Sequence, residues 1–134
     1  MRAHSMIGLD TNVILRAVLD DDSEQSSRAK ALLETLTRES PGFVTTITLA
    51  EVYWIIRSRD GLGKDSALAV IRGLVESDAL EFDDGEGVVL ALEAAREGAD
   101  FADALIHSTL LQSGVTETFT FDRRAAQRLG WRLL

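Results

Sequence analysis

Short apolar runs with strand character alternate with longer runs of helical periodicity along almost the whole of this chain. The strand-like runs cover residues 6–9, 43–46, 80–82, 116–121 and 131–134. Apolar residues at helical spacing fill the intervals, over residues 13–19, 29–36, 48–59, 68–75, 88–97, 103–112 and 123–129. Strands that are joined through helices by short connections usually pair in parallel. The sequence therefore predicts an α/β sandwich with a mainly parallel central sheet flanked by helices.

Four acidic residues stand at the junctions, where a strand-like run ends or a helix-like run begins. They are Asp10, Glu51, Asp103 and Asp122. The carboxyl ends of parallel strands lie along one edge of a sheet, which is where open α/β folds bind their ligands. We therefore expect the four carboxylates to form one cluster. Oxygen ligands of this kind suit Mg²⁺ or Mn²⁺.

Each acid also has a purely structural explanation. Thr48 and Glu51 have the spacing of a capping box, and Asp100 could cap a helix whose first turn contains Asp103. The other two acids could cap the helices that follow them. The occurrence of an acid at all four junctions favours a cluster of carboxylates. Capping alone would not select an acid each time, because it needs only an oxygen acceptor. Gathered like charges repel one another unless a cation neutralises them.

Composition limits the class of protein. The 134 residues fit one domain, which we expect over residues 6–134. Met6 is a second candidate start, in which case residues 1–5 are a leader or a vector-derived segment. The absence of cysteine excludes iron–sulfur, thiol and cysteine-ligated zinc chemistry. Because no signal-like segment and no run near the ~20 apolar residues of a membrane span are present, we expect a soluble cytoplasmic protein.

The net charge of −8 argues against a general nucleic-acid coat, which would normally show a basic excess. The four predicted ligands supply half of that negative charge, however, and a bound cation would reverse the local sign. Nearly all the positive charge is arginine, which binds phosphate through a planar fork. Either local phosphate contacts or solvated surface would explain Arg57, Arg59, Arg123, Arg124, Arg128 and Arg132.

The segments around the four acids carry a family resemblance. They read IGLDTNVIL at residues 7–15, TLAEV at 48–52, FADALI at 101–106 and TFTFDR at 118–123. This ordered set resembles the successive acidic motifs of PIN-domain ribonucleases. It is particularly similar to VapC-type toxins of bacterial and archaeal toxin–antitoxin pairs, over about residues 6–134.

The resemblance implies a Mg²⁺- or Mn²⁺-dependent endoribonuclease that forms a homodimer and is neutralised by a cognate antitoxin. The metal-binding and catalytic carboxylates would be Asp10, Glu51, Asp103 and Asp122. Asn12 and Thr120 would orient those carboxylates, and Thr11 would supply a contact at the start of a helix. A transfer, ribosomal or messenger RNA could each be the substrate.

Three other side chains invite a functional role. His107 lies one helical turn after Asp103 and could act as a general acid, although packing on the helix is the simpler interpretation. Tyr53 is expected in the core. Trp54 is instead expected on a surface that binds a second copy of the chain or the antitoxin, since large aromatic side chains are enriched at interfaces.

Two other classes of protein remain open at this point. A receiver domain also holds Mg²⁺ in an acidic pocket at strand ends, but it places a lysine near its last strand, and no lysine follows Lys64 here. A non-catalytic binding module would use the four acids only as helix caps. This second alternative predicts that substitutions of Asp by Asn or Glu by Gln at these positions are tolerated and that the protein binds no metal.

Overall fold

The computed structural model describes residues 5–134 and divides into two compact units. The N-terminal unit ends at Gly85, and the C-terminal unit covers Glu86–Leu134. The predicted leader of residues 1–5 lies outside the described residues except for Ser5. The expectation of a single domain over residues 6–134 stays a prediction.

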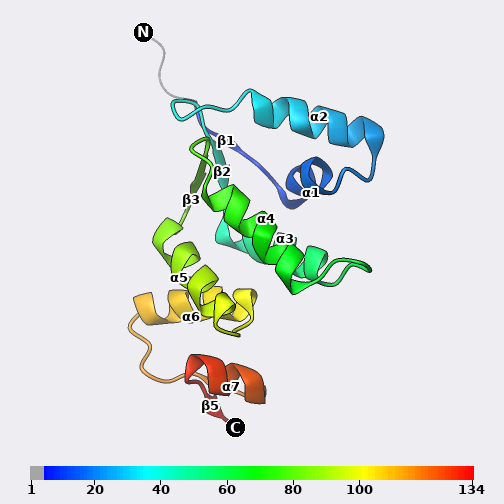
Figure 1. Ribbon diagram of the computed structural model, residues 1–134. Coiled ribbons are helices and arrows are strands. Elements are labelled where there is room, and N and C mark those ends of the chain that lie inside the picture. The colour runs from blue at the N-terminus through cyan, green and yellow to red at the C-terminus, as the bar shows by residue number, and fades with distance from the viewer. Residues whose placement is uncertain (1–4) are drawn as a thin grey trace. The chain divides into compact units, whose positions relative to one another are not determined.

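A three-stranded parallel sheet organises the N-terminal unit (Figure 1). Its strands are β1 (Ile7–Gly8), β2 (Gly42–Val44) and β3 (Leu80–Phe82), in the order β1-β2-β3. Ile7 and Leu80 both lie in register with Gly42. A Cβ on Gly42 would lie 2.8 Å from a methyl carbon of Leu9, so a larger residue at this central position would displace that side chain. The predicted parallel pairing is therefore confirmed for these strands.

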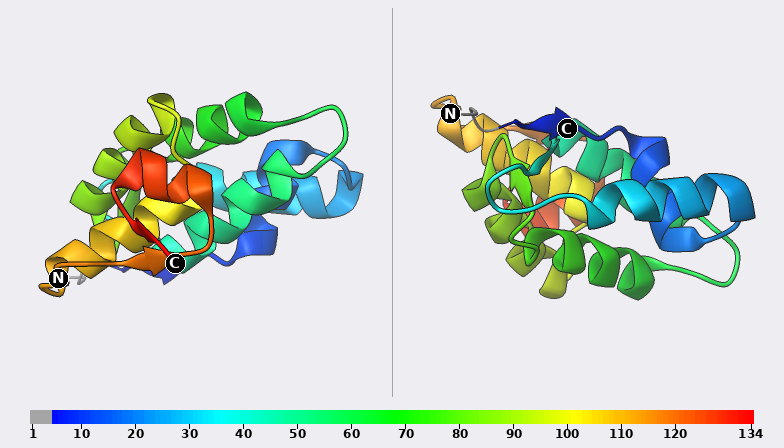
Figure 2. Two further views of the ribbon diagram at one scale, coloured as in Figure 1. Left: turned by 90° about the horizontal axis from the view of Figure 1, so that it is seen from below. Right: turned by 90° about the horizontal axis from the view of Figure 1, so that it is seen from above.

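Four helices complete this unit: α1 (Thr11–Leu19), α2 (Ser23–Glu34), α3 (Thr46–Arg57) and α4 (Lys64–Val75). Figures 1 and 2 show α1 beside α2 and α3 beside α4, and α1 also contacts α3. Asp10 caps α1 by accepting from the backbone N–H of Val13 at 3.1 Å, as the sequence predicts. The inward faces are apolar, and Tyr53 is fully buried as expected.

Helix α3 begins two residues before the predicted start. Thr45 is its N-cap and accepts from the backbone N–H of Thr48 at 3.1 Å. The interpretation of Thr48 and Glu51 as a capping box is therefore wrong, because Thr45 already satisfies the free N–H group. Glu51 lies in the second turn of the helix, where its carboxylate is free of any capping role.

The C-terminal unit contains the helices α5 (Gly85–Arg96), α6 (Phe101–Gln112) and α7 (Arg123–Leu129) and the strands β4 (Phe119–Thr120) and β5 (Arg132–Leu133). The first residue of α5, Gly85, still belongs to the N-terminal unit. The strands β4 and β5 are parallel and form a separate two-stranded sheet. Both are shorter than the predicted runs, because the ladder needs a partner at each residue and β5 supplies only two. Helix α7 contacts α6 and both strands.

Asp100 and Asp122 cap the two later helices. Asp100 accepts from the backbone N–H of Asp103 at 3.0 Å, and Asp122 accepts from that of Ala125 at 3.0 Å. Both caps agree with the sequence prediction. Over residues 5–134, every helix is too short or too polar to traverse a bilayer.

Candidate functional site

The N-terminal unit places two of the predicted carboxylates near the start of α1. Thr11, the first residue of α1, donates its hydroxyl to Oε1 of Glu51 on α3 at 2.5 Å. Asp10 directly precedes Thr11 and uses Oδ1 as the cap acceptor. Both carboxylates are exposed. The hydrogen bond therefore links the carboxyl end of β1 to the helix that follows β2, which is what a parallel sheet predicts.

The C-terminal unit brings the other two carboxylates into electrostatic contact. Burial raises the pKa of Asp103, and the negative charges of Asp100 and Asp122 raise it further. Asp103 is half-buried in the first turn of α6, whereas Asp122 is exposed before α7. A cation would stabilise carboxylates that repel one another in this way.

Thr120 fixes the chain at Asp122. Its hydroxyl accepts from the backbone N–H of Asp122 at 3.0 Å, while the Asp122 carboxylate accepts from Ala125. The side chain of Thr120 therefore positions Asp122 through the main chain. Asn12 lies exposed in the first turn of α1, beside Asp10 on the wall of a pocket.

Each unit thus contains two of the four predicted ligands, Asp10 and Glu51 in the N-terminal unit and Asp103 and Asp122 in the C-terminal unit. Within either unit of the described residues, no group of three or more His, Asp or Glu side chains could hold a metal ion. The assembly of all four carboxylates into one cluster stays a prediction. The donor set fits a hard divalent cation, because every ligand is an oxygen and one pair already carries mutual repulsion.

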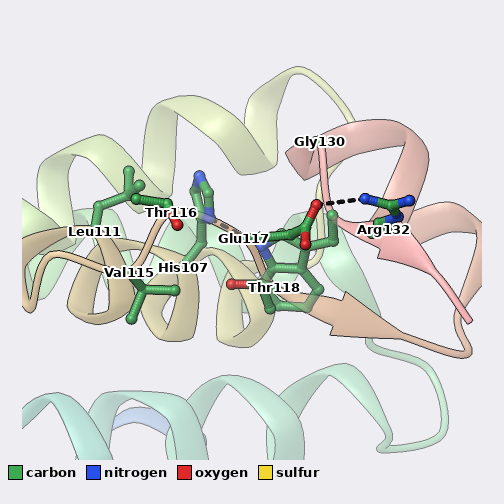
Figure 3. Close-up of a pocket in the computed structure, with 9 residues that line it drawn as sticks. His107, Leu111, Val115, Thr116, Glu117, Thr118, Gly130 and Arg132 are labelled. Carbon is green, nitrogen blue, oxygen red and sulfur yellow. Dashed lines mark hydrogen bonds and ion pairs between the residues drawn. The ribbon is translucent and has the colours of Figure 1, made fainter.

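His107 is held by packing within the C-terminal unit. Trp131 donates its indole N–H to Nδ1 of His107 at 2.9 Å, and the two rings are tilted by 58°. Figure 3 shows His107 on the wall of a cavity of about 350 Å³, together with Leu111 and the ion pair between Glu117 and Arg132. This hydrogen bond accounts for the half-buried histidine without a role in proton transfer.

Five of the six arginines predicted as phosphate contacts or surface already have partners. Arg57 lies over the ring of Trp54 at 5.6 Å, and Arg132 pairs with Glu117 at 2.7 Å. Arg124 and Arg128 donate to the carbonyl groups of Gly98 and Glu97, which follow α5. Arg59 pairs with Asp21 at 2.7 Å. The sixth, Arg123, is exposed beside Asp122 in the first turn of α7.

Two acids that sequence reasoning missed hold the elements of the N-terminal unit in place. Asp83 follows β3 and accepts from the backbone N–H of Thr46 at 2.8 Å, so that it anchors the start of α3. Asp21, in the turn after α1, accepts from Arg59 at 2.7 Å and from Arg16 at 2.9 Å. These two guanidinium groups, Arg59 first, hold the pKa of Asp21 below its usual range. Asp83 carried a sequence signal, since it is an acid at a strand end.

Comparison with known proteins adds a family assignment. Residues 7–130 match the family model described as PIN domain, a range that includes all four predicted ligands. No curated protein matches the chain. PIN domains are generally nucleases, and they typically use divalent metal ions.

Replacement of Asp103 by asparagine should stabilise the metal-free protein at neutral pH. Because the folded-state pKa of Asp103 is raised, the folded protein holds this proton more tightly than the unfolded chain does. The wild type should therefore lose stability relative to Asp103→Asn as the pH rises from the ordinary value of 3.8 through the raised pKa. Thermal unfolding in EDTA should show a gain on the order of 2 °C at neutral pH that vanishes in acid.

The matched control is Glu93→Gln, which removes an exposed charge from α5 in the same unit. The unfolding temperature of Glu93→Gln should stay close to that of the wild type from acid to neutral pH. An Asp103→Asn variant that is no more stable than Glu93→Gln at neutral pH would contradict crowding of carboxylates at this position.

Proposed function

The chain belongs to the PIN domain family, and on that premise we propose that it is a metal-dependent endoribonuclease that acts as the toxin of a type II toxin–antitoxin pair. The observation that carries the proposal is the family match over residues 7–130, because it covers the whole ordered set of acidic motifs. The metal-dependent nuclease class follows from the family. The choice of RNA and the toxin role rest on the particular resemblance of the motifs to VapC-type toxins.

In this proposal a Mg²⁺ or Mn²⁺ ion is held by oxygen atoms of Asp10, Glu51, Asp103 and Asp122. When bound, the ion would activate water for attack on the phosphodiester and neutralise the charge that develops on the phosphate. No protein nucleophile is needed for such a reaction. The chemistry of this chain is then the placement of carboxylates in a geometry that a divalent cation accepts.

The residues around the carboxylates support that role. The hydroxyl of Thr11 fixes one oxygen of Glu51 and leaves the other free to bind. Asp10 commits Oδ1 to the backbone of α1, which orients its second oxygen. Thr120 sets the position of Asp122 through the backbone. Partners of this kind usually change metal affinity or activity about 10–100-fold when they are removed.

Cleavage of total RNA by the purified protein tests the central proposal. We expect cutting in Mg²⁺ or Mn²⁺, no cutting in EDTA, and products with 5′-phosphate and 3′-hydroxyl ends. Asp103→Asn should lose cleavage by at least about 100-fold, because it removes a ligand charge from the ion. Cleavage that persists in EDTA, or that survives in Asp103→Asn, would contradict a carboxylate-held metal. If the protein binds no Mn²⁺ by calorimetry and cuts nothing, it is a non-catalytic binding module in which Asp10 and Asp122 serve only as helix caps.

Graded replacement of Thr11 tests how Glu51 is oriented. Thr11→Val removes the hydroxyl at nearly constant volume, so Mn²⁺ affinity should fall roughly 10-fold or more while some activity survives. Thr11→Ser keeps the donor and should behave like the wild type. Equal Mn²⁺ affinities for the valine and serine variants, measured by calorimetry, would show that the hydrogen bond does not prepare a metal ligand.

The surface of α3 offers a place for the proposed partners. Ile47 and Trp54 are 73% and 56% exposed, and at this spacing they lie on the same side of the helix as Glu51. Arg57 covers part of the Trp54 ring. We assign this apolar strip to a second copy of the chain or to the antitoxin, both in the cytoplasm. Exposed large aromatic residues commonly anchor such interfaces.

Truncation of Trp54 tests the interface. An aromatic anchor at an interface typically contributes about 2 kcal/mol or more, so Trp54→Ala should weaken dimer or antitoxin binding roughly 30-fold. Leu90→Ala on α5 is the control, because Leu90 is 55% exposed and thus as accessible as Trp54. Sedimentation and antitoxin titration provide the readouts. Unchanged oligomeric mass together with unchanged antitoxin affinity would remove Trp54 from both interfaces.

A further inference from the structure

A pocket of about 470 Å³ opens between α1 and α2 in the N-terminal unit. Every residue that lines it belongs to these helices or to the α1 cap: Asp10, Asn12, Val13, Arg16, Gln25, Arg28, Ala29 and Leu32. The pocket therefore begins at one of the predicted metal ligands and extends along the groove between the two helices. Its position makes it a candidate path for substrate.

The spacing of the side chains explains how the groove forms. The α2 residues in the lining are Gln25, Arg28, Ala29 and Leu32, which are three, one and three positions apart. This spacing places them on one face of the helix, the face turned to α1. Val13, Ala29 and Leu32 give the wall an apolar part. Polar side chains form the rest of the wall: Asp10 and Asn12 at the start of α1, and the guanidinium groups of Arg16 and Arg28.

Arg16 is fixed in this groove. Its Nε donates to Oε1 of Gln25 at 2.7 Å, and its Nη1 donates to Oδ1 of Asp21 at 2.9 Å. The other oxygen of Asp21 accepts from Arg59, which ties the turn after α1 to the end of α3. Two of the five N–H donors of Arg16 are thus committed to the protein, and the rest of the fork is held in place for another acceptor.

Arg28 is a different kind of residue. It is exposed on α2 and makes no ion pair within residues 5–134. Its charge is therefore uncompensated in a protein whose net charge is −8, and it lines the same pocket as Asp10. The Arg28 guanidinium therefore gives the groove a position where an anion is favoured within an otherwise acidic molecule. The uncommitted N–H donors of the ion-paired Arg16 line the same pocket.

We propose that the α1–α2 groove binds the sugar–phosphate backbone of the RNA strand next to the scissile bond, with Arg28 and Arg16 contacting phosphates and Val13 and Leu32 contacting the ribose. This inference rests on the ribonuclease function proposed above and adds the path of the substrate to it. Contacts with phosphate position a strand without reading its sequence. The groove therefore sets affinity and register, and base selection lies elsewhere.

Salt-dependent binding of RNA by the full chain tests the groove. The probe is a short fluorescein-labelled single-stranded RNA of mixed sequence, and the protein is Asp103→Asn in EDTA, so that the probe stays intact. Adding Arg28→Gln should weaken binding about 5-fold at low salt. It should also lower the slope of log affinity against log salt by about 0.7, the value for one phosphate contact with a single strand. Arg28→Lys should restore most of the slope, because it keeps the charge.

Arg72→Gln is the matched control, since Arg72 is exposed on α4 outside the pocket and the substitution removes the same charge. It should leave the salt slope unchanged. In the active protein, Arg28→Gln should raise KM about 5-fold with little change in kcat, because a phosphate contact away from the reacting bond acts mainly on binding.

The outcomes separate the groove from the nuclease. If Arg28→Gln and Arg72→Gln give the same salt slope while metal-dependent cleavage is intact, the groove is not the substrate path and the proposed function stands. If the unsubstituted protein neither binds nor cuts RNA under any metal condition, both proposals fall. A lower slope for Arg28→Gln alone, with rescue by Arg28→Lys, establishes the groove.

Discussion

Parallel pairing of β1 and β3 with β2 is the constraint on which the N-terminal unit depends. Because all three strands run the same way, the residues that follow them lie along one edge of the sheet. Asp10, the Thr45 cap and Asp83 each follow one of these strands, in that order. At the centre of the sheet, a side chain in place of Gly42 would displace the Leu9 side chain. The chemistry of the unit is therefore concentrated at one end of a very short sheet.

Much of this arrangement could be predicted from sequence, because helix periodicity and strand character are local signals. All seven helices of the described residues overlap predicted helical runs, although α2 begins six residues and α4 four residues before the predicted start. The caps Asp10, Asp100 and Asp122 lie at the predicted junctions. The predicted start of α3 was wrong by two residues. Two threonines three residues apart both suit a cap, and the choice depends on where β2 ends. That boundary is set by tertiary pairing, which local sequence does not encode.

The features that sequence missed are those defined by contacts between elements. Arg28 looked like any exposed helical arginine, and only the packing of α1 against α2 places it on the wall that also contains Asp10. The bond between Trp131 and His107 joins residues 24 positions apart, so spacing along α6 gave no indication of it. Arg124 and Arg128, which sequence left open as phosphate contacts or solvated surface, are exposed and donate to carbonyl groups just after α5.

Asp83 shows that an acid at a strand end can serve architecture alone. It accepts from the backbone of Thr46 at 2.8 Å and so joins the end of β3 to the first turn of the helix that carries Glu51. A change at Asp83 would release that helix start, and Glu51 would shift with it. Loss of nuclease activity in such a mutant would thus be an indirect effect on geometry. In a mutational scan Asp83 would be indistinguishable from a metal ligand by activity alone, although its carboxylate accepts from the backbone N–H and the hydroxyl of Thr46.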